Sequence, residues 1–114
     1  MKKIFFSLSV CCVLAACSSK PETYKCINEA DSKDIQSLSI GNGTAILGFT
    51  TLNAQCHVNG NNTVYSKNSE DCKKIGGDSP YVNLVFDKVI FRAVYNESSP
   101  TGVSVQQIYS CTKL

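Results

Sequence analysis

Cysteine has the widest range of chemistry in this chain, because its thiol can form disulfides, ligate a metal or attack a substrate. The four cysteines that follow residue 20 lack the close Cys-x2-Cys spacing of a metal site, so no metal or cofactor is expected. Four thiols without metal-site spacing are typical of small exported proteins with two disulfides, for which there are three possible connectivities. We favour Cys26–Cys111, whose partners share a Tyr-x-Cys context near the two ends of the chain, together with the short-range pair Cys56–Cys72.

Few residues here could run acid–base or nucleophilic catalysis. His57 is the only histidine and stands beside Cys56, and four paired thiols leave no cysteine nucleophile in the domain. Glu70 and Asp71 are typical of the first turn of a helix. Three further acidic residues could contribute to a pair of catalytic carboxylates, but all of them fall in or near predicted turns: Asp78, Asp87 and Glu97. We therefore do not expect an enzyme.

Tyrosines and polar loops favour protein recognition instead, because tyrosine buries a large amphipathic surface at low entropic cost. Three loops are candidate contact surfaces, at residues 59–62, 76–81 and 96–102. The candidate partner-binding residues are Asn59, Asn61, Tyr65, Ser79, Tyr81 and Tyr95. The alternative for each tyrosine is that its ring fills the core.

The elements that would position these residues are mainly β-strands. Alternating or β-branched segments predict strands at 35–40, 44–50, 55–58, 63–66, 81–86, 89–95 and 103–109. Asp87-Lys88 is either a tight turn or the middle of one long strand. Residues 69–76 predict a short helix with Ser69 as N-cap, acids first, bases last and a Gly stop. The expected fold is mainly β: a small antiparallel β-sandwich or barrel with one short helix and two disulfides.

The N-terminus has the three parts of an export signal: the basic Met1-Lys2-Lys3, an apolar run over 4–13, and the small-residue stretch Leu14-Ala15-Ala16 before Cys17. The tetrapeptide that ends at Cys17 resembles the lipobox of bacterial lipoproteins. The resemblance implies lipidation at Cys17 and cleavage before it; the alternative is an ordinary secretory signal. Ser18 and Ser19 follow in place of Asp, which by resemblance to Gram-negative sorting implies the outer membrane, facing the periplasm.

The expected organisation is a cleaved signal (1–16), a lipidated cysteine with its tether (17–23), and a β-rich periplasmic domain (24–114). Removal of Lys2 and Lys3 from the 11 basic residues leaves nine against nine acidic ones. A neutral domain lacks the positive field that a phosphate backbone requires, so nucleic acid is an unexpected partner. The expected partners are a membrane, reached through the lipid, and a protein.

The layout resembles the membrane-bound inhibitors of chicken-type lysozyme: lipobox, short tether, an opening Thr23-Tyr24-Lys25-Cys26, and a closing Tyr109-Ser110-Cys111-Thr112-Lys113. The Ser-Gly-x-x-Tyr motif of that family is absent, and Ser79-Pro80-Tyr81 has a different spacing, so no inhibitory residue is carried over. A looser resemblance is to periplasmic immunity lipoproteins that neutralise lipases and cell-wall hydrolases. Both imply occlusion of an envelope-active enzyme. The alternatives are a structural or assembly lipoprotein of an envelope machine, and a surface adhesin or ligand-binding module.

Overall fold

The strands of this chain follow one another with short connections, and a single helical turn interrupts them. The computed structural model describes residues 20–75, 79–99 and 104–114, so the predicted signal and the predicted lipidation site at Cys17 lie outside the described residues. The elements in chain order are β1 (Glu22–Asn28), β2 (Ile35–Gly41), β3 (Thr44–Leu47), β4 (Thr50–Leu52), β5 (Ala54–Asn59), β6 (Asn62–Ser66), α2 (Ser69–Cys72), β7 (Tyr81–Asp87), β8 (Arg92–Ser98) and β9 (Ser104–Lys113).

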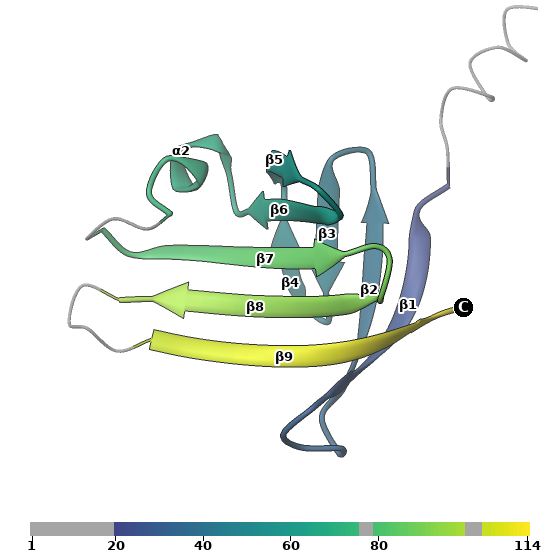
Figure 1. Cartoon of the computed structure of the whole chain (residues 1–114). Coiled ribbons are helices and arrows are strands. Elements are labelled where there is room, and N and C mark those ends of the chain that lie inside the picture. Colours follow the sequence, from purple (N-terminus) through teal and green to yellow (C-terminus); the bar gives the residue numbers. More distant parts are fainter. Residues whose placement is uncertain (1–19, 76–78, 100–103) are drawn as a thin grey trace, which may run out of the picture.

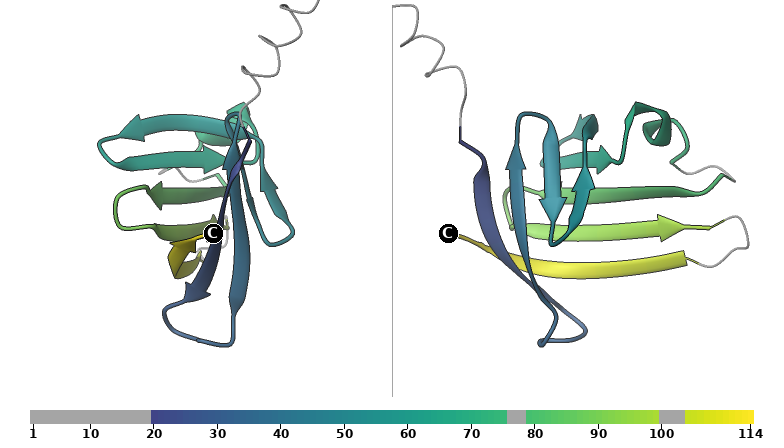
Figure 2. Two further views of the ribbon diagram at one scale, coloured as in Figure 1. Left: turned by 90° about the vertical axis from the view of Figure 1, so that its right-hand side faces the viewer. Right: turned by 180° about the vertical axis from the view of Figure 1, so that it is seen from behind.

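The described strands form one antiparallel nine-stranded sheet in the order β4-β3-β2-β1-β9-β8-β7-β6-β5. Its two edge strands, β4 and β5, are neighbours in the chain, separated only by Asn53. The chain therefore passes directly from one edge of the sheet to the other, and the barrel is nearly closed. In Figure 1, β6–β9 run horizontally across the view and β1–β4 run roughly vertically, so the two sets of strands cross. Figure 2 shows the same crossing from two further sides. The predicted mainly β antiparallel fold is confirmed.

The core lies between these two crossed halves of the sheet. Leu38, Leu52 and Leu84 have no exposed surface, and they come from β2, β4 and β7. The ring of Tyr24 on β1 packs against that of Phe86 on β7, with centroids 5.0 Å apart. Apolar side chains contributed by both halves are what hold the crossing together, at about 25 cal/mol for each Å² removed from water.

Both predicted disulfides are confirmed. Cys26 on β1 stands opposite Cys111 on β9, with their Cα atoms 4.0 Å apart. The terminal strands therefore lie side by side, and the Leu114 N–H also donates to the Thr23 carbonyl at 3.0 Å. Cys56–Cys72 joins β5 to α2, across 16 residues of sequence.

The strand predicted over 44–50 is wrong in one respect, because it is two strands. β3 ends at Leu47, which pairs with Thr50 at the start of β4, and Gly48-Phe49 form a two-residue turn between them. Gly48 has φ +60°, and a glycine with positive φ at the first central position is typical of a type II′ hairpin. The alternation of apolar residues continued through the turn and hid it from the sequence.

The strand predicted at 89–95 starts later, at Arg92 in β8. Asp87 ends β7, and its carboxylate accepts the N–H groups of Val89 and Ile90, at 2.9 and 3.2 Å. Phe91 then takes φ +56°. Of the two alternatives for Asp87-Lys88, the turn is correct, but it extends over four residues because the aspartate side chain organises it.

The predicted helix is present but shorter, and Ser69 is not its N-cap. α2 is capped by Asn68, whose side-chain oxygen accepts the Asp71 N–H at 2.9 Å. Lys73 is the C-cap, so the helix ends before the predicted Gly76, which lies outside the described residues. In the described part of the chain, no helix has the length and apolar character that crossing a bilayer requires.

Candidate functional site

Two of the three predicted contact loops come to the same end of the sheet. Tyr81 at the start of β7 pairs with Ser98 at the end of β8, so the loops at 76–81 and 96–102 converge there. Positions 76–78 and 100–102 of these loops lie outside the described residues. The third loop, at 59–62, lies at the opposite end, because Asn62 pairs with Asp87. The structure therefore separates Asn59 and Asn61 from Tyr81.

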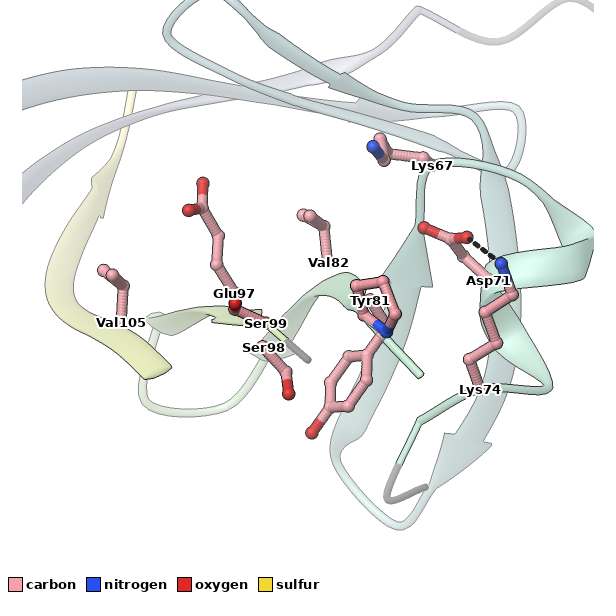
Figure 3. Close-up of a pocket in the computed structure, with 10 residues that line it drawn as sticks. Lys67, Asp71, Lys74, Tyr81, Val82, Glu97, Ser98, Ser99 and Val105 are labelled. Atoms are coloured by element: carbon pink, nitrogen blue, oxygen red, sulfur yellow. Dashed lines mark ion pairs between the residues drawn. The ribbon is translucent and has the colours of Figure 1, made fainter. Parts of the chain in front are cut away.

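A hollow of about 400 Å³ opens at the end where the two loops meet. We name it the open-end hollow, and Figure 3 shows its lining: Lys67, Asp71, Lys74, Pro80, Tyr81, Val82, Glu97, Ser98, Ser99 and Val105. Its floor is a cross-strand row, because Val82 pairs with Glu97 and Glu97 with Val105. α2 and the residues around it supply the opposite wall.

The wall is held in place by three local interactions. α2 has only four residues, too few to be a stable helix alone. The disulfide from Cys72 to Cys56 ties it to β5, and the Asn68 cap satisfies its first turn. Just before it, the buried Ser66 hydroxyl donates to the Val82 carbonyl at 2.8 Å, which fixes the end of β6 against the floor. The hollow is therefore preorganised on its helical side.

Charged groups of both signs surround the open-end hollow. Asp71 is buried and pairs with Lys74, the carboxylate oxygen and Nζ lying 3.7 Å apart. Glu97 accepts a hydrogen bond of 2.6 Å from the hydroxyl of Tyr95. Burial, and then this carboxylate, raise the pKa of Tyr95, so the phenol stays protonated and continues to donate. Both carboxylates are thus held by neighbours, with Lys67 close to the same space in Figure 3.

Asp71 and Glu97 each lie within reach of a side-chain partner in the same molecule, Lys74 and Tyr95 respectively. His57 lies exposed on β5 and does not line the open-end hollow. Within the ranges that the structure describes, no three His, Cys, Asp or Glu side chains group as metal ligands.

The remaining predicted residues divide between the surface and the core. Ser79 is exposed directly before Pro80, which lines the open-end hollow, and Tyr81 is half-buried at its rim. Tyr65 and Tyr95 are buried with 4 and 8 % exposure, so for these two the alternative holds and their rings fill the core. Burial also raises the pKa of Tyr65.

Sequence reasoning did not find the contribution of Lys67 and Lys74, nor the exposed ring of Phe49. Asp71 and Lys74 were assigned only to helix end charge, although their three-residue spacing already placed them on one face of a helix. The sequence predicts Phe49 within one strand over 44–50, whereas it lies in the turn between β3 and β4. Gly48 was the available signal, since glycine within a strand pattern marks a possible turn.

The chain matches no protein-family model, no curated protein and no solved structure.

Proposed function

We propose that this protein is a periplasm-facing outer-membrane lipoprotein, without enzymatic activity of its own, that binds and neutralises an envelope-active enzyme such as a secreted lipase or cell-wall hydrolase. The observation that carries the proposal is the convergence of two polar loops around the open-end hollow. Tyr81 stands at the rim of that hollow and charges of both signs surround it.

The chemistry of the hollow supports a protein as the occupant. Tyr81 offers an aromatic ring that can be buried on binding, and Val82 and Val105 give the floor apolar area. Lys67 and Glu97 provide a cation and an anion at the margin, where charged groups steer partners and select among them. Because strands and a stapled helical turn hold these groups, little ordering cost opposes association.

The proposed anchor supports an envelope location. Lipid on Cys17 would attach the chain five residues before β1 begins at Glu22. Fully extended, five residues reach at most about 18 Å. The domain would then act on enzymes that work at or near the membrane surface. Two or more acyl chains would make such attachment stable, since one alone holds only marginally.

The test measures enzyme inhibition with a variant at each end of the barrel. The mature protein is titrated against a chicken-type lysozyme, a bacterial phospholipase and a peptidoglycan amidase as probes. We expect one of them to be inhibited stoichiometrically, and Tyr81→Ala to weaken inhibition by about 10- to 100-fold, as for an interfacial tyrosine anchor. Asn61→Ala, at the opposite end, is the matched control and should leave inhibition unchanged.

Other outcomes would overturn the proposal. Inhibition that Asn61→Ala weakens and Tyr81→Ala does not would remove the open-end hollow from the account. No inhibition of any probe, together with envelope leakage on deletion of the gene, would favour the structural or assembly alternative. Mass spectrometry that finds an unmodified Cys17 thiol on the exported protein would reject the anchor.

A further inference from the structure

Phe49 is the most exposed large apolar residue in the described part of the chain. Its relative exposure is 106 %, so the ring contacts essentially nothing in its own molecule. The Gly48-Phe49 turn joins β3 and β4, and the Leu47–Thr50 pair closes it. The Gly48 N–H also donates to the Ser37 carbonyl at 2.8 Å, which ties the turn to β2. The ring is therefore presented on a fixed hairpin.

A second hollow, of about 210 Å³, lies directly beside this ring. We name it the Phe49 hollow, and its lining consists of Gln36, Leu47, Phe49, Thr50, Tyr95, Gln107 and Tyr109. All seven side chains are uncharged. The open-end hollow has four charged residues in its lining, so the two hollows differ in the chemistry they accept.

Three polar groups that line the Phe49 hollow are already paired within the molecule. The Tyr95 hydroxyl donates to Glu97 at 2.6 Å, and the Tyr109 hydroxyl donates to Asp34 at 2.8 Å. The Gln36 side-chain amide donates to the other oxygen of Asp34 at 2.7 Å. An apolar ring that enters the hollow therefore leaves no hydroxyl or amide of these three unpaired, and it avoids the cost of an unsatisfied buried polar group.

The chain around Phe49 contains no charge over a long stretch. From residue 35 to residue 66, between Asp34 and Lys67, there is no Asp, Glu, Lys or Arg. This stretch includes both edge strands, β4 and β5, where exposed charges normally prevent association. Ile35, Ile46 and Val58 are exposed within it. An absence of charged residues together with an exposed aromatic ring is typical of the centre of a protein–protein interface.

We infer that Phe49 of one molecule occupies the Phe49 hollow of a second copy, and that the second copy returns its own Phe49 in exchange. A ring beside a hollow that accepts it is self-complementary, which is the requirement of an isologous twofold interface. The partner surface must itself be uncharged, and the 35–66 stretch of a second copy meets that condition. A lipid surface is disfavoured because interfacial segments use Lys and Arg toward anionic headgroups, and this stretch has neither.

The test replaces Phe49 with the photo-crosslinking residue p-benzoylphenylalanine in the full-length protein, expressed in a Gram-negative host together with a second, differently tagged copy. Irradiation of intact cells should give a product carrying both tags, with the crosslink mapped to the segments of the second copy that contain Tyr95 or Gln107. The matched control carries the crosslinker at Ile90, which is also exposed, at 62 %, but lies on the β7–β8 turn. It should give no such product.

Sedimentation of the mature protein in detergent supplies the second measurement. Phe49→Ala removes two rings from each dimer, and at about tenfold for each ring the dissociation constant should rise about 100-fold. Thr50→Arg leaves the ring in place and puts a charge at the rim of the hollow, and it should also dissociate the dimer, whereas Ile90→Ala should not. A monomeric wild-type protein, or crosslinks from position 49 only to lipid or to other proteins, would overturn the inference. An unaffected dimer in both Phe49→Ala and Thr50→Arg would do so as well.

Discussion

Removing each disulfide separately gives a quantitative test of how the barrel is held together. In the chain-entropy model the stabilisation grows with the length of the loop that the bridge closes. For Cys26–Cys111, with a separation of 85 residues, the model gives about 4.6 kcal/mol. For Cys56–Cys72, with a separation of 16, it gives about 3.1 kcal/mol. The long-range pair is also more buried, at 0 and 9 % exposure, so its loss adds a packing cost.

The assay is urea unfolding of the mature protein with Cys17→Ser, followed by circular dichroism. The two variants are Cys26→Ala with Cys111→Ala, and Cys56→Ala with Cys72→Ala. We expect the first to lose at least about 1.5 kcal/mol more unfolding free energy than the second, provided the denaturant dependence (m-value) is unchanged. The total loss of about 4.6 kcal/mol for the first variant is comparable to the whole unfolding free energy of many small domains.

The two variants should also differ in function. Without Cys56–Cys72 the barrel keeps its seam between β1 and β9, but α2 loses its attachment to β5. Inhibition through the open-end hollow should then weaken while the barrel stays folded. Equal losses of stability, or a larger loss for the short-range pair, would refute the loop-length reasoning for this fold.

Three smaller perturbations test the helix cap and two groups of titrating side chains. Asn68→Ala removes the bond to the first turn of α2 and should cost about 1 kcal/mol in urea unfolding; an unchanged midpoint would show that the disulfide alone holds the turn. Hydrogen bonds from its neighbours lower the pKa of Asp34 below 3.8, so the stabilisation is full above that pH and is lost as pH falls through the folded-state pKa. The donors to Asp34 are Asn28, Gln36 and Tyr109. Asp34→Asn should therefore reduce the fall in melting temperature as the pH is lowered, and an unchanged fall would contradict this. Burial, followed by a carboxylate partner, raises the pKa of Tyr24 and of Tyr109 to about 12, and burial also raises the pKa of Tyr65 and of Tyr95. Absorbance at alkaline pH should therefore show these four phenols ionising late, with the stability contributed by Tyr24 and Tyr109 lost as pH rises from 10 through about 12.

The sequence was sufficient for the fold class and for the disulfide pairs, because both depend on patterns that packing reinforces. Matching Tyr-x-Cys contexts at the two ends indicated that β1 and β9 pair, and the register places Cys26 opposite Cys111. The turns were harder. The turn at Gly48 interrupts an apolar alternation that continues to Phe49, so the pattern alone did not show it. At Asp87-Lys88 the sequence left a turn and one long strand open, and the hydrogen bonds that the Asp87 carboxylate accepts show that the chain reverses there.

The candidate site was only partly predictable, for a related reason. Loops at 76–81 and 96–102 were chosen for composition, and their convergence depends on the β7–β8 register, which composition does not encode. Tyrosines illustrate the same limit. Tyr81 and Tyr95 both lie in strands rich in aromatic and branched residues, yet Tyr81 stands at the rim of the open-end hollow and Tyr95 is buried in the core. Alternation along a strand predicts which face a side chain lies on, but not how close that position is to the end of the sheet.

The seam between β1 and β9 has a mechanical consequence for a chain held at its N-terminus. Force applied there enters at Glu22 and would peel β1 away from its neighbours one residue pair at a time. Peeling stops at Cys26, because the covalent bond to Cys111 passes the load to β9. β9 pairs with β8 over residues 104–110, and the far end of β8 lines the open-end hollow. A load applied at the N-terminus would thus reach the end of the sheet beside the open-end hollow after separating only the residues of β1 that precede Cys26.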